Sequence, residues 1–151
     1  MIDDVDRIMA VMGAAFDPEY REAWNRNQIE SALTFGNCHV ILVDSAGREP
    51  IDDEAAAGFI LSRTTLDEEE LLLFAVAPDF RGRGLGGKML GCFIENCRNR
   101  SVAVIHLEMR RGNLAEKLYR TWGFTPVGQR PNYYRTTSGQ SIDAITFRLS
   151  L

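Results

Sequence analysis

The sequence predicts a single α/β domain in which helices cover both faces of a mixed β-sheet. The chain has 151 residues, which fits one domain spanning residues 1–151. Residues 71–76 form an unbroken apolar run, typical of a central strand covered on both faces. Segments with the apolar spacing of helices and segments typical of strands follow one another in the order ααβββαβαββ. This order is typical of a mixed sheet packed between helices.

Apolar periodicity and turn residues locate the individual elements. Val5, Ile8 and Met12 recur at helical spacing, so the first helix is expected over residues 4–15. The acidic residues 67–70 are expected to form a solvated turn before the central strand. The expected helices cover residues 4–15, 25–33, 89–97 and 113–121, and the expected strands cover residues 40–43, 57–61, 71–76, 102–108, 124–135 and 142–149.

Composition argues against several functional classes. The 17 Lys and Arg residues against 21 Asp and Glu residues give a net charge of -4, so we expect no direct binding to nucleic acid. No apolar run approaches the roughly 18 residues of a membrane span, and the N-terminus does not resemble a signal peptide. We therefore expect a cytoplasmic protein. The three cysteines lack metal-ligand spacing, so free thiols and no metal site are expected.

A glycine-rich loop follows the central strand and precedes a helix. Four glycines occur within six residues, at Gly82, Gly84, Gly86 and Gly87. Exposed backbone N–H groups at the positive end of a helix dipole bind phosphate. The loop is therefore predicted to hold a phosphate-bearing ligand. Its basic neighbours, which can pair with phosphate oxygens, are Arg81, Arg83 and Lys88.

The residues of this loop match two nucleotide-binding motifs, but neither motif fits the structural context expected around the loop. Gly82, Gly84 and Gly87 satisfy the dinucleotide pattern, but five residues separate Val76 from Gly82 where that motif needs a tight turn. The same stretch matches a P-loop, but Met89 stands where a hydroxyl must hold magnesium. A different phosphate-bearing ligand is therefore favoured.

Residues 76–86 resemble the coenzyme A motif of the GNAT N-acetyltransferases, Arg/Gln-x-x-Gly-x-Gly/Ala after a strand. Residues 107–113 and 118–124 are similar to the second half of that family. Residues 130–134, together with Asp143 and Ala144, resemble the RimI-type branch, the ribosomal-protein-alanine N-acetyltransferases. Phe16, Trp24 and Gln28 resemble the N-terminal segment of the same branch. The resemblance implies the GNAT fold, with a mixed and mostly antiparallel central sheet of about six to seven strands.

The resemblance also implies acetyl-CoA as co-substrate and a role for each site residue. Glu108 would accept a proton and Tyr119 would donate one. The backbone of the central strand would pair with the pantetheine arm, Asn113 would hydrogen-bond the arm further along, and the glycine-rich loop would cradle the pyrophosphate. The coenzyme-binding residues implied in this way are Phe74, Ala75, Val76, Arg81, Gly82, Arg83, Gly84, Leu85, Gly86, Gly87, Lys88 and Asn113.

The implied reaction is acetyl transfer to the N-terminal α-amine of a protein, with an N-terminal alanine of a ribosomal protein as the leading acceptor. An α-ammonium group has a pKa of about 7.7–8.0 and must lose a proton before attacking a thioester, which a carboxylate can accept. The alternatives are a GNAT enzyme acting on a small-molecule amine or on other protein N-termini, and a non-catalytic acyl-CoA-binding protein. The expected protein is a monomer or weak dimer.

Some residues depart from the family pattern or stay open. Asn113 and Tyr119 are six residues apart where seven are expected, so either the helix starts after Asn113 or one of the two roles is displaced. Leu73 stands where many relatives carry a polar residue. His106 shares a face with Glu108 by strand alternation but is not placed among the catalytic residues. The aromatics Tyr133, Tyr134 and Trp24 either line a peptide groove or pack in the core; Trp24 lies, with Phe16 and Tyr20, in a loop whose aromatics look exposed.

Overall fold

The computed structural model describes residues 2–151 and contains one six-stranded sheet with four α-helices. This architecture confirms the predicted mixed α/β fold. The helices are α1 (Asp4–Ala15), α2 (Arg26–Thr34), α3 (Leu85–Asn99) and α4 (Glu116–Thr121), with single 3-10 turns η1 (Pro18–Tyr20) and η2 (Pro78–Phe80). The strands are β1 (Cys38–Val43), β2 (Gly58–Thr65), β3 (Glu68–Val76), β4 (Val104–Arg110), β5 (Thr125–Arg135) and β6 (Ser141–Ser150).

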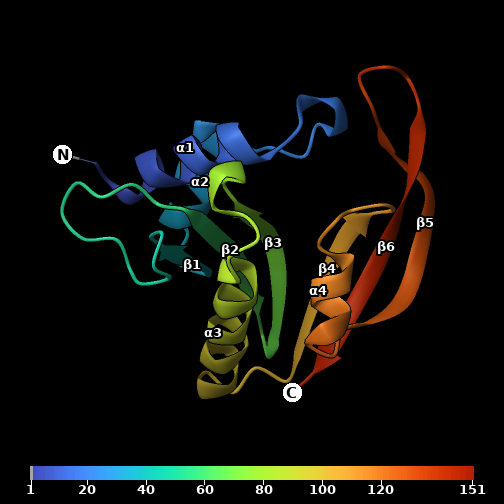
Figure 1. Ribbon diagram of the computed structural model, residues 1–151. Helices are drawn as coiled ribbons and strands as arrows, with labels where there is room; N and C mark the ends of the chain where they lie inside the picture. The colour runs from blue at the N-terminus through green and yellow to red at the C-terminus, as the bar shows by residue number, and fades with distance from the viewer. Residues whose placement is uncertain (1) are drawn as a thin grey trace.

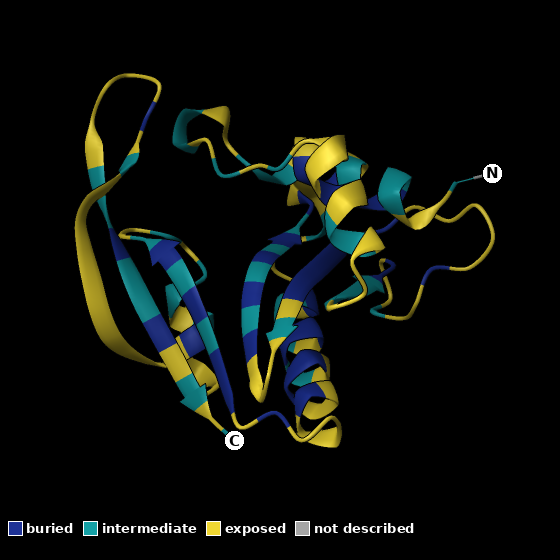
Figure 2. Ribbon diagram, turned by 180° about the vertical axis from the view of Figure 1, so that it is seen from behind, coloured by how far each residue is buried: buried dark blue, intermediate teal, exposed yellow. Residues whose placement is uncertain are grey.

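The sheet separates the helices into two layers. Its strand order is β1-β2-β3-β4-β6-β5, and every neighbouring pair is antiparallel except β3 with β4. Helices α3 and α4 pack on one face, whereas α1 and α2 cover the other face of the β1–β3 half (Figure 1). Strand β5 is exposed over almost its whole length (Figure 2). Within residues 2–151, no helix is long and apolar enough to cross a membrane.

An extra residue in β3 changes which face of the sheet its side chains reach. Ser62 of β2 pairs with Leu71, whereas the residue before it, Leu61, pairs with Leu73. Leu72 is therefore an extra residue in β3 and forms a β-bulge. Leu71 therefore packs in the core beneath α3, and Leu73 packs in the core beneath α1. A bulge bends its strand and locally increases the twist.

Beyond this bulge β3 and β4 separate. Their parallel pairing runs from Glu68 opposite Val104 to Leu71 opposite Leu107 and stops there. The two strands then diverge toward their C-terminal ends (Figures 1 and 2). Residues 73–76 of β3 and 108–110 of β4 thus each have a strand partner on one side only. We call the space between these two strand ends the split.

The prediction of a solvated acidic turn at residues 67–70 is wrong. The turn consists of Leu66 and Asp67, and the three following glutamates belong to β3. Glu69 is fully buried and accepts hydrogen bonds from the Ser62 and Thr64 hydroxyls and from Arg100 Nη1 at 3.0 Å. Strand alternation turns this carboxylate toward the core, where three donors compensate its burial.

The environment of Glu69 affects the pH dependence of stability. Burial by itself raises the pKa of the Glu69 carboxyl, but the hydrogen bonds from Arg100, Ser62 and Thr64 together hold this pKa below its ordinary value of 4.5. A lowered folded-state pKa contributes stability above the ordinary pKa, and this stability is lost as the pH falls through the folded-state pKa.

We predict that Glu69→Gln lowers the free energy of unfolding at pH 7 by about 1–3 kcal/mol, because Arg100 loses its charged partner. Urea unfolding at pH 7 and pH 3 measures this difference. The gap between the two proteins should narrow at pH 3, because the carboxyl of the unfolded chain is then protonated and the stability that the lowered folded-state pKa provides is being lost. A gap of the same size at both pH values would contradict the assigned role of the carboxylate.

Candidate active site

The glycine-rich loop connects the end of β3 to the N-terminus of α3. Gly84 is the N-cap of the helix, and both Gly82 (φ +76°) and Gly84 (φ +79°) adopt the left-handed conformation that favours glycine. A Cβ added at either position would meet no atom within 4 Å, so here the backbone conformation requires glycine. The free N–H groups of the first turn of this 15-residue helix can donate hydrogen bonds to a bound anion.

The basic side chains around this loop have different surroundings. Arg81 donates from Nε to the Val76 carbonyl and from Nη2 to the Ala15 carbonyl, each at 3.0 Å. The guanidinium carbon of Arg83 lies 5.4 Å from the centre of the Phe80 ring. Lys88 donates to the carbonyl of Ala46 at 3.4 Å, in the loop after β1. The three positively charged side chains thus lie near the loop, but the Arg81 guanidinium is already hydrogen-bonded to two carbonyl groups.

Gly86 of the motif and Gly91, one turn further into α3, also allow the α4 region to approach α3. A Cβ at Gly86 would lie 3.2 Å from Leu118 and from Phe74, and a Cβ at Gly91 would lie 2.7 Å from the Trp122 ring. The high glycine content therefore has a packing reason in addition to backbone exposure. The sequence reasoning attributed Gly86 to the ligand alone and did not consider Gly91, whose isolated position in a helix was the available signal.

Glu108 lies on β4 beside the split. Its neighbours Leu107 and Met109 point into the core below α3, so alternation turns Glu108 to the opposite face. The carboxylate is 22% exposed, and its Oε2 lies 3.3 Å from Arg130 Nε and 3.5 Å from the Thr146 hydroxyl. His106 shares this face as expected, with its Nε2 3.9 Å from Glu68.

Tyr119 occupies the other side of β4, within the core between the sheet and α4. Its ring lies 5.9 Å from that of Phe74 and 5.8 Å from that of Phe124, measured between centroids. Burial raises the pKa of the Tyr119 hydroxyl far above its usual value, and the Glu22 carboxylate contributes to the same shift. The phenol therefore stays protonated at neutral pH.

The short spacing between Asn113 and Tyr119 is accommodated by a turn. Helix α4 begins at Glu116 instead of the expected residue 113, and the Asn113 side-chain oxygen accepts the Ala115 N–H at 2.8 Å. An asparagine in such a turn favours a start outside the helix. Of the two alternatives left by the sequence, the helix starts after Asn113. Asn113 also lines a hollow of about 640 Å³ along α4.

The segment before α2 contributes residues that the sequence analysis did not identify. Glu22 Oε1 accepts a hydrogen bond from Arg110 Nε at 3.1 Å, and both side chains are less than one fifth exposed. The Arg110 guanidinium lies 3.7 Å from the centre of the Tyr20 ring. The pair joins residues 88 positions apart, so no local sequence pattern could have signalled it.

The aromatic residues of this segment are not exposed as expected. Phe16 and Trp24 are half-buried and pack against the core beneath α1 and α2, and Tyr20 lies against Arg110. On the opposite side Tyr133 is exposed and in edge-to-face contact with Tyr134. Burial, followed by the charges of Glu22 and Glu108, raises the pKa of Tyr134 to about 12.

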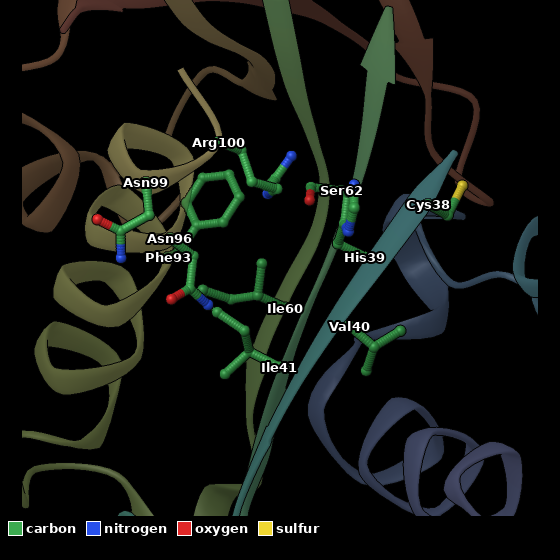
Figure 3. A pocket seen from close by; sticks show the side chains of 10 residues that line it. All are labelled: Cys38, His39, Val40, Ile41, Ile60, Ser62, Phe93, Asn96, Asn99 and Arg100. Atoms are coloured by element: carbon green, nitrogen blue, oxygen red, sulfur yellow. The ribbon is translucent and has the colours of Figure 1, made fainter. Parts of the chain in front are cut away.

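A separate cavity of about 470 Å³ lies between α3 and β1, away from the split. Ile41, Ile60 and Phe93 form its apolar floor, while Cys38 and Val40 point away from α3, as alternation along β1 requires (Figure 3). None of the residues predicted for the active site lines this cavity. The split is therefore the candidate active site.

Comparisons with known proteins agree with this fold and loop. The family model of the acetyltransferase (GNAT) domain matches residues 36–126. A [ribosomal protein bS18]-alanine N-acetyltransferase of Salmonella typhimurium is 39% identical over 100 residues, covering 66% of this chain and 67% of that protein. The Escherichia coli protein of the same name is 40% identical over 96 residues, covering 63% of this chain and 64% of its own. The aligned segment thus spans about two thirds of these relatives.

The likeness in three dimensions extends further than the aligned sequence. The crystal structure of the ribosomal-protein-S18-alanine N-acetyltransferase from Escherichia coli superposes with a TM-score of 0.80 and 28% identity, over 98% of this chain and 89% of that one. The fold, the family model and these relatives together define the class of protein.

The chain belongs to the GNAT acetyltransferase family and is an acetyltransferase. The family uses acetyl-CoA as co-substrate, and the unpaired edge of β3 together with the loop N–H groups fits an extended, phosphate-bearing ligand. Among residues 2–151, no group of three His, Cys, Asp or Glu side chains could hold a metal ion.

We predict that the Glu22–Arg110 pair stabilises the site. Glu22→Ala should lower the free energy of unfolding by about 1–3 kcal/mol, because it leaves a mostly buried guanidinium without its acceptor. Glu30→Ala is the matched control: it removes an exposed carboxylate 3.5 Å from Arg26, and should change stability by less than about 0.5 kcal/mol. Urea unfolding compares the two, and equal effects would show that the buried pair contributes nothing particular.

Proposed function

We propose that this enzyme transfers the acetyl group of acetyl-CoA to the N-terminal α-amine of a protein, and that the acceptor is an N-terminal alanine of a ribosomal protein. The main support is the split itself. It exposes a strand edge beside the glycine-rich loop and presents Glu108 on the far face of β4. The names of the relatives from Salmonella typhimurium and Escherichia coli support the choice of acceptor.

We assign the coenzyme to the edge of β3 and the N-terminus of α3. The backbone of residues 74–76 lies beyond the last pair with β4, and alternation turns the polar groups of Phe74 and Val76 to that edge. The Val76 carbonyl already accepts a hydrogen bond from Arg81, so the Phe74 groups and the Val76 N–H remain available to the amides of a pantetheine arm. Amides of residues 82–87, with Arg83 and Lys88 nearby, would receive the pyrophosphate. Asn113 uses its carbonyl oxygen within its own turn, which leaves the amide nitrogen for the arm.

In the proposed reaction the acceptor nitrogen attacks the thioester carbon directly. Glu108 takes the proton that the α-ammonium must lose, either directly or through water. The new C–N bond forms, the C–S bond breaks, and Tyr119 gives a proton to the leaving thiolate. The acylated nitrogen releases its second proton through water, which restores the Tyr119 hydroxyl. Tyr119 suits this role because its buried hydroxyl stays protonated. Arg130 and Thr146 orient the Glu108 carboxylate.

The acceptor would approach from the face of the sheet that carries Glu108. The Tyr133–Tyr134 pair and the Glu22–Arg110 pair lie near the base, since Glu22, Arg110 and Glu108 are all close enough to affect the pKa of Tyr134. These aromatic and charged side chains would line the approach of the acceptor.

The proposal predicts a specific pattern of acetyl transfer. Peptides that begin with alanine should be acetylated faster than peptides that begin with serine or methionine, and polyamines should not react. Glu108→Gln should lower kcat by about 10²–10⁴-fold, the usual contribution of a general base, while coenzyme A still binds. Steady-state kinetics and calorimetry measure the two effects.

Other outcomes of the same assay support the alternatives. Acetylation of polyamines alone would indicate a small-molecule acetyltransferase. Binding of acetyl-CoA without transfer to any amine would indicate a non-catalytic acyl-CoA-binding protein. Unchanged turnover of Glu108→Gln would assign the base to another residue.

A further inference from the structure

Residues 16–25, which connect α1 to α2, extend from the N-terminal half of the fold toward the turn between β5 and β6 (Figure 1). We call this segment the strap. Its two ends are fixed, since it leaves α1 after Ala15 and enters α2 through Asn25, whose side chain caps that helix. Its contacts with the C-terminal half are made by Glu19, on the β5–β6 turn, and by Tyr20 and Glu22, on Arg110 at the end of β4. It therefore connects the two sides of the split.

The first of these contacts is made by Glu19 with the β5–β6 turn. The Thr137 N–H donates to the Glu19 carbonyl at 3.0 Å, and the Thr137 and Ser138 hydroxyls each donate to its carboxylate at 2.7 Å. The hydrogen bonds from Ser138 and Thr137 lower the pKa of the Glu19 carboxyl, so these contacts are made to the ionised group.

The second contact is the Glu22–Arg110 pair at the end of β4, with Tyr20 against the guanidinium. Arg110 is two residues beyond Glu108 on the same face of the strand. The strap is thus held directly beside the proposed general base. Its position defines one side of the space that an acceptor can occupy.

Arg81 fixes the start of the strap from the glycine-rich loop. The carbonyl of Ala15 belongs to the last turn of α1, where helix carbonyls lack a partner within the helix. Arg81 Nη2 donates to this carbonyl while its Nε donates to Val76 at the end of β3, both at 3.0 Å. The planar guanidinium holds these two donors at a fixed spacing, whereas the donors of a lysine ammonium all belong to one nitrogen.

We infer that Arg81 is a positioning residue for the acceptor: it holds the start of the strap against the end of β3, and the strap forms one side of the space that the acceptor occupies. This inference rests on the proposed function. It differs from the expectation that Arg81 binds the pyrophosphate, because its guanidinium is directed to two backbone carbonyls. Arg83 and the loop N–H groups remain for the phosphates.

Kinetics of Arg81 variants test this role. Arg81→Met should raise the KM for a synthetic peptide with an N-terminal alanine by about tenfold, the effect of losing about one charge-assisted hydrogen bond. Its Kd for coenzyme A, measured by calorimetry without acceptor, should change by less than about threefold. Arg81→Lys should recover little of the peptide KM, because a single ammonium nitrogen does not reproduce the spacing of the Nε and Nη2 donors that reach the two carbonyls.

Arg83→Met is the matched control on the same loop. It removes a positive charge two residues away that binds neither carbonyl, so it should weaken coenzyme A and leave the peptide KM unchanged. If Arg81→Met weakens coenzyme A as strongly as Arg83→Met does, with an unchanged peptide KM, Arg81 is a coenzyme ligand and the inference is overturned.

Hydrogen exchange separates a failure of this inference from a failure of the proposed function. In Arg81→Met without any substrate, the amides of residues 16–25 should exchange faster, while those of β3 stay protected. Unchanged exchange in the strap would overturn the inference whatever the acceptor is. If the wild-type enzyme binds coenzyme A but does not acetylate the alanine peptide, the proposed acceptor is wrong, and the exchange result still decides the role of Arg81.

Discussion

The separation of β3 from β4 is the constraint on which the rest of the structure depends. One inserted residue, Leu72, ends the parallel pairing after Leu71 and Leu107 and leaves two strand ends without partners on their facing edges. Unpaired backbone groups inside a fold need a substitute partner, and an extended ligand rich in amides supplies one. The glycine-rich loop follows β3 after the short η2 turn, so one extended ligand could span the strand edge and the loop. The proposed coenzyme site is therefore a consequence of sheet geometry.

The same separation divides the chemistry between two environments. Tyr119 is buried with aromatic neighbours on the helical side of β4, where desolvation keeps its phenol protonated. Glu108 lies on the other side, where its partly exposed carboxylate contacts Arg130 and Thr146. The proposed proton donor and the proposed proton acceptor are thus kept apart by one strand, and only a substrate within the split would reach both. The strap adds a third element, because it connects the loop that receives the coenzyme to the face that would receive the amine.

The sequence predicted the features that depend on local patterns. The order of the elements, the mixed sheet and the glycine-rich turn at the start of α3 follow from periodicity and from the special conformations of Gly82 and Gly84. Features that depend on contacts between distant residues were missed. The bulge at Leu72 lies within a uniformly apolar run, so the change of face left no trace there. Glu69 looked solvated because its donors, above all Arg100, are supplied by other elements.

The central claim is that the exposed edge of β3 receives the coenzyme, and amide exchange with and without coenzyme A tests it most directly. Our account predicts that saturating coenzyme A slows exchange at Phe74, at Val76 and at residues 82–87, because these N–H groups gain partners. Exchange at residues 105–107 should stay the same, because these residues pair with β3 on one side and with β6 on the other. Protection confined to the cavity between α3 and β1, with residues 74–76 unaffected, would contradict the account.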